Sequence, residues 1–211
     1  TSFCSPFSMP WASRWKDGGN FINPMCGSGT LAIEGALIAL DRAPGLTRNN
    51  YGFMHLKGFQ PSLWREIRTK RRKEVRKQFP GKIIATDHNE GAVRAALQNA
   101  RTAGVDHLIE FDVCDYQETS IPGGGGVVIF NPAYGERLGE VEALEATYQG
   151  IGDFFKRKCQ GYRGYIFTGN FNLIKRVGLK TKRRIPFFNG EIECRLLEYE
   201  LYEGSRKSLI P

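Results

Sequence analysis

The stretch Phe21-Ile22-Asn23-Pro24-Met25-Cys26-Gly27-Ser28-Gly29-Thr30 decides the fold of this 211-residue chain. An apolar pair opens it, two glycines lie near its end, and a helical pattern of apolar residues follows over 31–40. Gly27 and Gly29 permit a tight turn and a close approach of the backbone to a ligand. The stretch therefore predicts a strand, a ligand-binding loop and a helix, the opening unit of an α/β sheet. It lacks the lysine of a GxxxxGK[ST] loop, which disfavours nucleoside triphosphate binding.

Acidic residues follow the next two predicted strands. Residues 82–86 read as a strand that ends at Asp87, and residues 108–111 read as a strand that leads to Asp112 and Asp115. A carboxylate at Asp87 can accept hydrogen bonds from both ribose hydroxyls of a nucleoside. Dinucleotide folds place that acid about 20 residues after the glycines. Because Asp87 lies much further along the chain, the spacing counts against a nicotinamide cofactor.

A fourth apolar run, residues 127–130, is followed by Asn131-Pro132-Ala133-Tyr134. Open α/β sheets bind ligands at the carboxyl edge of the strands. The Asn131 side-chain oxygen and the Pro132 carbonyl can both accept from one NH2 group, and the Tyr134 ring can stack on the base that carries it. Accepting those protons makes a delocalised exocyclic amine a better nucleophile. The motif favours methylation of such an amine, with a plain strand-to-turn exit as the alternative.

These motifs resemble a known family. The ordered series is similar to class I S-adenosylmethionine-dependent methyltransferases of the Asn/Asp-Pro-Pro-Tyr type. Residues 23–30 and 131–139 resemble the bacterial 23S rRNA guanine-N2 methyltransferases, whose relatives carry an RNA-binding THUMP domain. The resemblance extends from about Trp15 to Leu201. It implies an α/β, Rossmann-like class I methyltransferase fold, with a mostly parallel seven-stranded sheet and a C-terminal antiparallel hairpin.

The resemblance also implies a site for S-adenosylmethionine. The residues expected to bind this cofactor are Asn23, Met25, Cys26, Gly27, Ser28, Gly29, Thr30, Asp87, His88, Asp115 and Asn131. Asn131, Pro132 and Tyr134 are the expected catalytic residues, and Asp115 would accept from the adenine amine. His88 serves equally well as a plain surface residue, and Cys26 lacks the partner base of a nucleophile. Asn23 replaces the usual aspartate, and Ala133 replaces the second motif proline.

Positive charge is concentrated in two segments. The net charge is +8 and the pI is about 9.3. One predicted helix, for which Ser62 is a candidate N-cap, carries most of the excess, and a second cluster covers 175–184. The sign imbalance favours RNA over a merely solvated helix face. The residues expected to contact RNA are Arg68, Arg71, Arg72, Lys182 and Arg183.

The chain is organised as one catalytic domain over 21–205, with an insertion over 41–80 that carries the basic helix and an irregular segment over 1–20. Asn89 is predicted to cap a helix that stops at Gly104. Residues 181–202 read as a hairpin. Since the chain does not begin with methionine, it is expected to be a piece of a longer protein. The resemblance implies that a separate RNA-binding domain is missing from it.

Cysteine and histidine usage bounds the cellular setting. Five cysteines form no CxxC pair, and their odd number argues against a disulfide framework, which indicates a reducing cytoplasm. The three histidines show no metal-ligand spacing, so no metal is expected. No apolar run reaches the roughly 18 residues of a membrane helix.

Three other functions stay open. The amine acceptor can be adenine N6 in RNA or DNA, guanine N2 in tRNA, or a glutamine side chain. The second alternative, which the departures at Asn23 and Ala133 favour, is a decayed methyltransferase domain that binds RNA without catalysis. A nicotinamide oxidoreductase is the third. Glu136 and Arg137 can orient the substrate or pair with each other.

Overall fold

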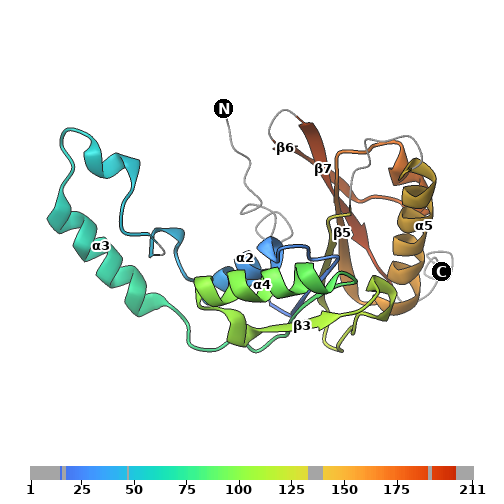
Figure 1. Ribbon diagram of the computed structural model, residues 1–211, viewed down its shortest axis with the longest axis horizontal. Coiled ribbons are helices and arrows are strands. Elements are labelled where there is room, and N and C mark those ends of the chain that lie inside the picture. Colours follow the sequence, from blue (N-terminus) through green and yellow to red (C-terminus); the bar gives the residue numbers. More distant parts are fainter. Residues whose placement is uncertain (1–14, 16–17, 47, 133–139, 190–191, 203–211) are drawn as a thin grey trace, which may run out of the picture.

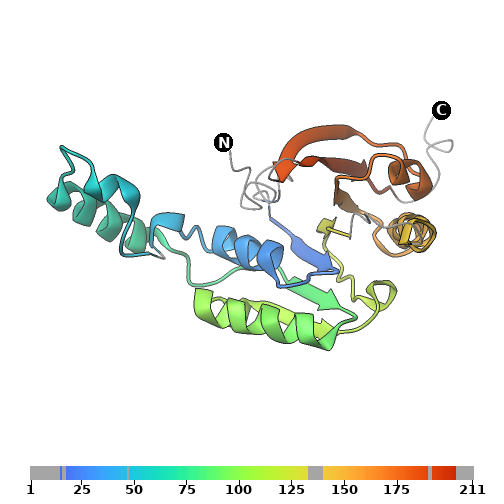
Figure 2. The same ribbon diagram turned by 45° about the horizontal axis from the view of Figure 1, so that its top comes forward.

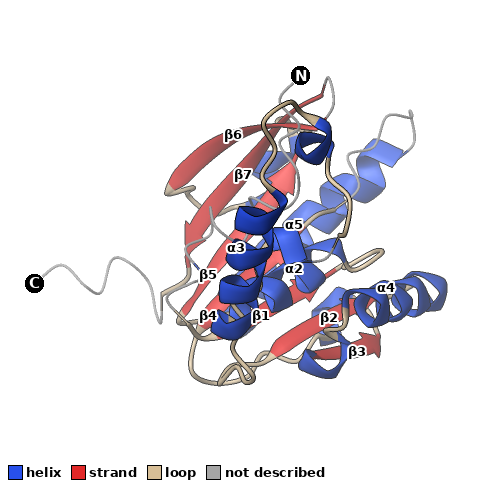
Figure 3. Cartoon of the chain, turned by 90° about the vertical axis from the view of Figure 1, so that its left-hand side faces the viewer, coloured by secondary structure: helices blue, strands red, loops and turns tan. Residues whose placement is uncertain are grey.

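The computed structural model describes residues 15, 18–46, 48–132, 140–189 and 192–202. Seven strands form one sheet in the order β3-β2-β1-β4-β5-β7-β6 (Figure 3). The strands are β1 (Asn20–Pro24), β2 (Ile83–Asp87), β3 (Ile109–Val113), β4 (Gly126–Phe130), β5 (Tyr162–Thr168), β6 (Arg183–Asn189) and β7 (Ile192–Glu200). β7 runs antiparallel to both of its neighbours, and the other pairs are parallel. The predicted sheet with its closing hairpin is confirmed.

Helices cover both faces of the sheet, whose strands are red in Figure 3. The longer ones are α2 (Thr30–Ala39), α3 (Pro61–Glu74), α4 (Glu90–Ala103) and α5 (Glu140–Lys158). Short 3-10 turns are η3 (Pro44–Leu46), η4 (Gly52–His55), η5 (Asp106–Leu108), η6 (Tyr116–Glu118) and η7 (Leu173–Val177). Among the described residues, no helix is both long and apolar enough to span a bilayer.

The core consists of two apolar layers, one on each side of the sheet. Phe21 faces the layer built with α2 and α4, and its neighbour Ile22 faces the layer built with α5 and η7. Both side chains are fully buried, as are those of Val127 to Phe130. Burial on both faces explains why the central strands read as continuous apolar runs.

Helix ends agree with the sequence in one case and differ in another. The Asn89 side chain accepts from the Ala92 N–H and caps α4, which ends at Gly104 in the left-handed conformation. The candidate cap Ser62 is wrong: Gln60 precedes α3, and Pro61 occupies the first turn. Proline suits that position because its missing N–H would have no helical partner there.

The insertion forms an arm that projects from the sheet (Figures 1 and 2). We call residues 48–74 the arm. None of the side chains of α3 is buried. Four aromatic residues hold the arm together through ring contacts with centroids 5.1 to 5.9 Å apart, namely Tyr51, Phe53, Phe59 and Trp64. The arm is therefore held by an aromatic cluster of its own, none of whose four residues is buried.

Candidate active site

The glycine loop turns sharply between β1 and α2. Gly27 and Gly29 have φ values of 54° and 81°, and Met25, which has a side chain, also lies in the left-handed region at 57°. A Cβ at Gly29 would lie 2.8 Å from the Cβ of Ala96 in α4. Glycine is thus required at Gly29 by both conformation and packing. A Cβ at Gly27 would meet no atom within 4 Å, so that turn of the loop faces open space.

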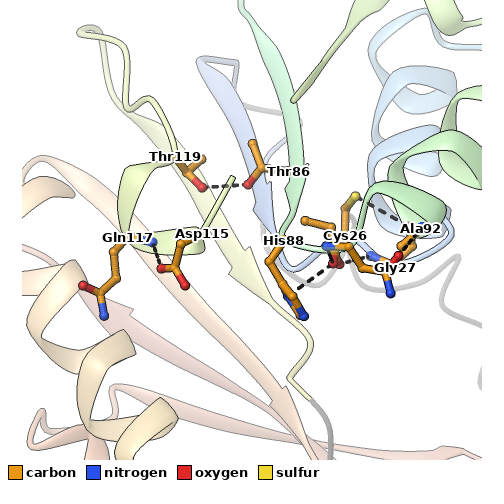
Figure 4. Close-up of polar contacts among 10 residues, drawn as sticks. Cys26, Gly27, Thr86, His88, Ala92, Asp115, Gln117 and Thr119 are labelled. Carbon is orange, nitrogen blue, oxygen red and sulfur yellow. Dashed lines mark hydrogen bonds and ion pairs between the residues drawn. The ribbon is translucent and has the colours of Figure 1, made fainter. Parts of the chain in front are cut away.

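Asp87 at the end of β2 fixes the loop. Its Oδ2 accepts a hydrogen bond from the Gly27 N–H at 3.0 Å, and its Oδ1 accepts from the Asn89 N–H at 3.0 Å. The side chain is 9% exposed. A carboxylate has about four lone-pair positions, so two acceptor sites are left for a ligand. His88 is exposed, and its Nδ1 lies 3.5 Å from Asp87 Oδ1 (Figure 4).

Asn23 lies inside β1 and is 0% exposed. Its Nδ2 donates to the Ile129 carbonyl of β4 at 3.0 Å, which ties the two central strands together. Its Oδ1 is buried without a hydrogen-bond partner. An aspartate at this position could not donate to Ile129. The replacement of the usual acid therefore adds a bond between strands and leaves one acceptor open at the base of the loop.

Asp115 follows β3 and caps η6, where its Oδ1 accepts from the Gln117 N–H at 2.8 Å. Beside it, the hydroxyl groups of Thr86 and Thr119 are 2.7 Å apart, and both residues are 1% exposed (Figure 4). This buried pair ties the end of β2 to the segment after β3. Asp115 and Asp87 thus belong to neighbouring, mutually fixed strand ends.

Asn131 directly follows β4 and is exposed, whereas Pro132 is buried. The register pairs Ile22 of β1 with Val128 of β4, and its continuation sets Asn131 level with Met25, at the start of the glycine loop. The motif residue and the loop therefore meet at one edge of the sheet. Tyr134, Ala133, Glu136 and Arg137 lie outside the described residues.

The remaining loop residues have plain environments. Ser28 and Thr30 are exposed, with hydroxyl oxygens 3.4 Å apart. Cys26 is buried, and burial together with the nearby Asp87 charge raises the pKa of its thiol to about 12. A thiol of this pKa stays protonated near neutrality, which agrees with the expectation that Cys26 is no nucleophile.

Some residues that hold this site in place could not be identified from the sequence. Asn99 of α4 donates from Nδ2 to the Ser28 carbonyl at 3.0 Å, and the Asn89 backbone holds Asp87. Thr119 comes 33 residues after its partner Thr86. Such contacts depend on tertiary placement.

The basic residues of the arm divide into two groups. Arg68 donates to the Arg48 carbonyl at 3.1 Å and to Asn49 Oδ1 at 3.2 Å, and Arg71 pairs with Glu74 at 2.6 Å. These two arginines stabilise the arm itself. Arg72 is exposed, as is Arg65 one heptad earlier on the same face of α3. The face of α3 that carries Arg65 and Arg72 therefore presents exposed positive charge.

Lys182 and Arg183 lie at the other end of the sheet. Arg183 pairs with Glu198, whose side chain is 3% exposed, and Lys182 pairs with Glu200. Arg183 stands opposite Glu198 in β7, and Glu200 stands opposite Arg163 near the start of β5. The structure thus brings neither residue to the carboxyl edge where Asn131 and Asp87 meet.

Comparisons with known proteins find a matching family model and similar curated proteins. The family model described as "RMKL-like, methyltransferase domain" matches residues 7–198. A "Ribosomal RNA large subunit methyltransferase K/L" from Syntrophotalea carbinolica is 38% identical over 199 residues, which cover 92% of this chain and 28% of that protein. The chain thus spans less than a third of the length of this relative.

Solved structures share the fold. SMU.472, solved as a complex with SAH, has a TM-score of 0.85 at 24% identity, over 95% of this chain and 52% of that chain. A Listeria monocytogenes protein described as a predicted N6-adenine-specific DNA methylase has a TM-score of 0.80 at 28% identity, over 92% and 50%. The chain therefore shares its fold with these proteins over nearly its whole length.

Proposed function

Because this chain belongs to the RMKL-like methyltransferase domain family, we propose that it methylates the exocyclic N2 amine of a guanine in large-subunit ribosomal RNA. The observation that carries the proposal is the meeting of Asn131 with the glycine loop at one edge of the sheet. An acceptor pair for an NH2 group thus adjoins a site of the class that binds a methyl donor.

The cofactor is S-adenosylmethionine, and the described residues fit it. The Oδ1 of Asn23 is a buried acceptor without a partner, suited to an ammonium group. Gly29 caps α2 without a side-chain hydrogen bond, which leaves N–H groups of the first turn for a carboxylate. Asp87 has acceptor positions left for ribose hydroxyls, and Asp115 has a second oxygen for the adenine amine. Met25, Cys26, Gly27, Ser28, Thr30 and His88 would line the remainder of this site.

When bound, S-adenosylmethionine would supply the methyl group: the amine nitrogen would form a bond to the methyl carbon, the carbon–sulfur electron pair would go to sulfur, and a proton would pass from the amine to water. The Asn131 side chain and the Pro132 carbonyl would accept from the N2 amine and orient its lone pair. We assign Tyr134 to stacking on the flipped base. Since no residue needs to remove a proton before the attack, positioning supplies most of the rate.

Exposed positive charge on the face of α3 that carries Arg65 and Arg72 supports RNA as the substrate. Arg65 and Arg72 are exposed there on an arm that projects from the sheet (Figure 2). Each phosphate contact adds salt-dependent affinity. The name of the Syntrophotalea relative specifies large-subunit ribosomal RNA. A longer protein that contains this domain would add a separate RNA-binding domain.

Transfer of a labelled methyl group to undermodified large-subunit RNA tests the proposal, with digestion of the product to nucleosides. Label in N2-methylguanosine is the expected result. Label in N6-methyladenosine would overturn the assignment of the acceptor and favour the alternative named by the Listeria structure. Binding of cofactor without transfer to any nucleic acid would overturn the RNA substrate.

A further inference from the structure

The hairpin of β6 and β7 extends beyond the carboxyl edge of the sheet. Thr168, the last residue of β5, pairs with Arg195, and β7 begins three residues earlier at Ile192. At about 3.3 Å per residue, the hairpin rises about 10 Å past the end of β5. A Cβ at Gly169 would lie 3.2 Å from Ile192 Cγ2, so the loop after β5 runs alongside this extension.

This extension stands close to the reacting end of the site. β7 is separated from β4, which leads into Asn131, by the single strand β5. Two strand spacings amount to about 10 Å. The extension thus forms a wall next to the position assigned to the target base.

One face of the wall carries aromatic and planar cationic groups. Leu197 and Tyr199 face the α5 layer, so Arg195 and Glu193 point to the same side of the sheet. Phe188 shares that side because it stands opposite Glu193. The guanidinium carbon of Arg195 lies 4.1 Å from the centre of the Phe171 ring, and Glu193 accepts from Arg195 at 3.0 Å.

These groups suit unstacked bases better than phosphates. Phe188 is 54% exposed, so its ring is accessible to a base. The Arg195 side chain that stacks on Phe171 is 32% exposed, and its charge is partly offset by Glu193. Aromatic rings and guanidinium planes are the groups on which proteins stack single-stranded bases.

We propose that Phe171, Phe188 and Arg195 form a stacking surface for the nucleotides that flank the methylated base. The inference rests on the proposed function and deepens it: the substrate would be held as an unpaired strand at the carboxyl edge, while the arm contacts phosphates elsewhere. Stacking and charge would then be separable, because the stacking surface contributes affinity that depends little on salt.

The experiment compares the binding of single-stranded RNA across several salt concentrations by the unaltered chain and by Phe188→Ala and Phe188→Tyr. Phe188→Ala should weaken binding about tenfold, within the range for one lost stacked base, with the same slope of affinity against salt. Phe188→Tyr should bind like the unaltered chain. The affinity for S-adenosylhomocysteine should be unchanged in both.

Tyr202 provides a matched control, since it is an aromatic residue 45% exposed beyond the other end of β7. Tyr202→Ala should alter RNA affinity less than twofold. Equal effects of Phe188→Ala and Tyr202→Ala, or no effect of Phe188→Ala on a chain that methylates RNA, would overturn the stacking surface. A chain that neither binds nor methylates RNA would instead overturn the proposed function.

Discussion

The glycine loop and the arm are held in opposite ways. The loop is fixed by buried polar contacts: Asp87 accepts from two backbone N–H groups, and Asn23 bonds across the sheet to Ile129. The arm has no buried residue in α3, and Arg65 and Arg72 are exposed there. A small ligand of fixed shape requires a pre-formed cradle, whereas a large polyanion can be held by exposed charge. On the proposed function, the loop would hold the cofactor and the arm would contact RNA phosphates.

The largest expected effect belongs to Asn131, where the two functions meet. Asn131→Ala removes an acceptor for the attacking amine, so the transfer rate should fall about 100-fold or more, as when one hydrogen-bonding group is lost from a reacting centre. The dissociation constant of S-adenosylmethionine, measured by calorimetry, should change less than about threefold. A parallel loss of cofactor binding would refute the assigned role.

Asp87→Ala tests the cofactor cradle, by which we mean the glycine loop together with Asp87. The variant loses a charged acceptor that also holds Gly27. The dissociation constant of S-adenosylhomocysteine should therefore rise about 10- to 100-fold, which corresponds to the loss of about one hydrogen bond to a charged group. Asp112→Ala is the matched control, because Asp112 stands beside Thr86 in the adjacent strand and is exposed. Similar losses in both variants would mean that general charge, and not the cradle, governs affinity.

The arm should respond to salt. The double change Arg65→Glu and Arg72→Glu should weaken RNA binding about tenfold and lower the slope of log affinity against log salt by about one per lost phosphate contact. Cofactor affinity should stay the same. Lys180→Glu with Arg157→Glu makes the same change in net charge away from the arm, and equal effects of the two pairs would contradict a specific role for α3.

The smallest effect is expected for Cys26, which lies in the loop but carries no chemistry. Because the pKa of its thiol is about 12, the group stays neutral between roughly pH 6 and 9. Cys26→Ser should therefore leave the pH profile of methyl transfer unchanged in shape, with the rate within about threefold. If the rise or fall of the rate with pH disappeared in the variant, the thiol would be shown to titrate during the reaction.

The sequence predicted the sheet better than it predicted the contacts. Apolar runs that end at Asp87 and Asn131 located two strands and the edge at which they meet. The prediction that Ser62 caps α3 was wrong, because a proline in the first helical turn outweighs a nearby hydroxyl group. The pairing of Arg183 with Glu198 joins residues 15 apart across a hairpin, and a count of charges does not reveal which cation is already neutralised.

The central claim is that Asp87 serves cofactor binding and Asn131 serves methyl transfer. Its most direct test measures the single-turnover transfer rate of Asn131→Ala and Asp87→Ala at increasing concentrations of S-adenosylmethionine. The rate of Asp87→Ala should rise toward that of the unaltered chain at saturating S-adenosylmethionine, while the rate of Asn131→Ala should stay low at every concentration. Restoration of both variants, or of neither, would contradict separate roles for the cradle and the strand-end amide.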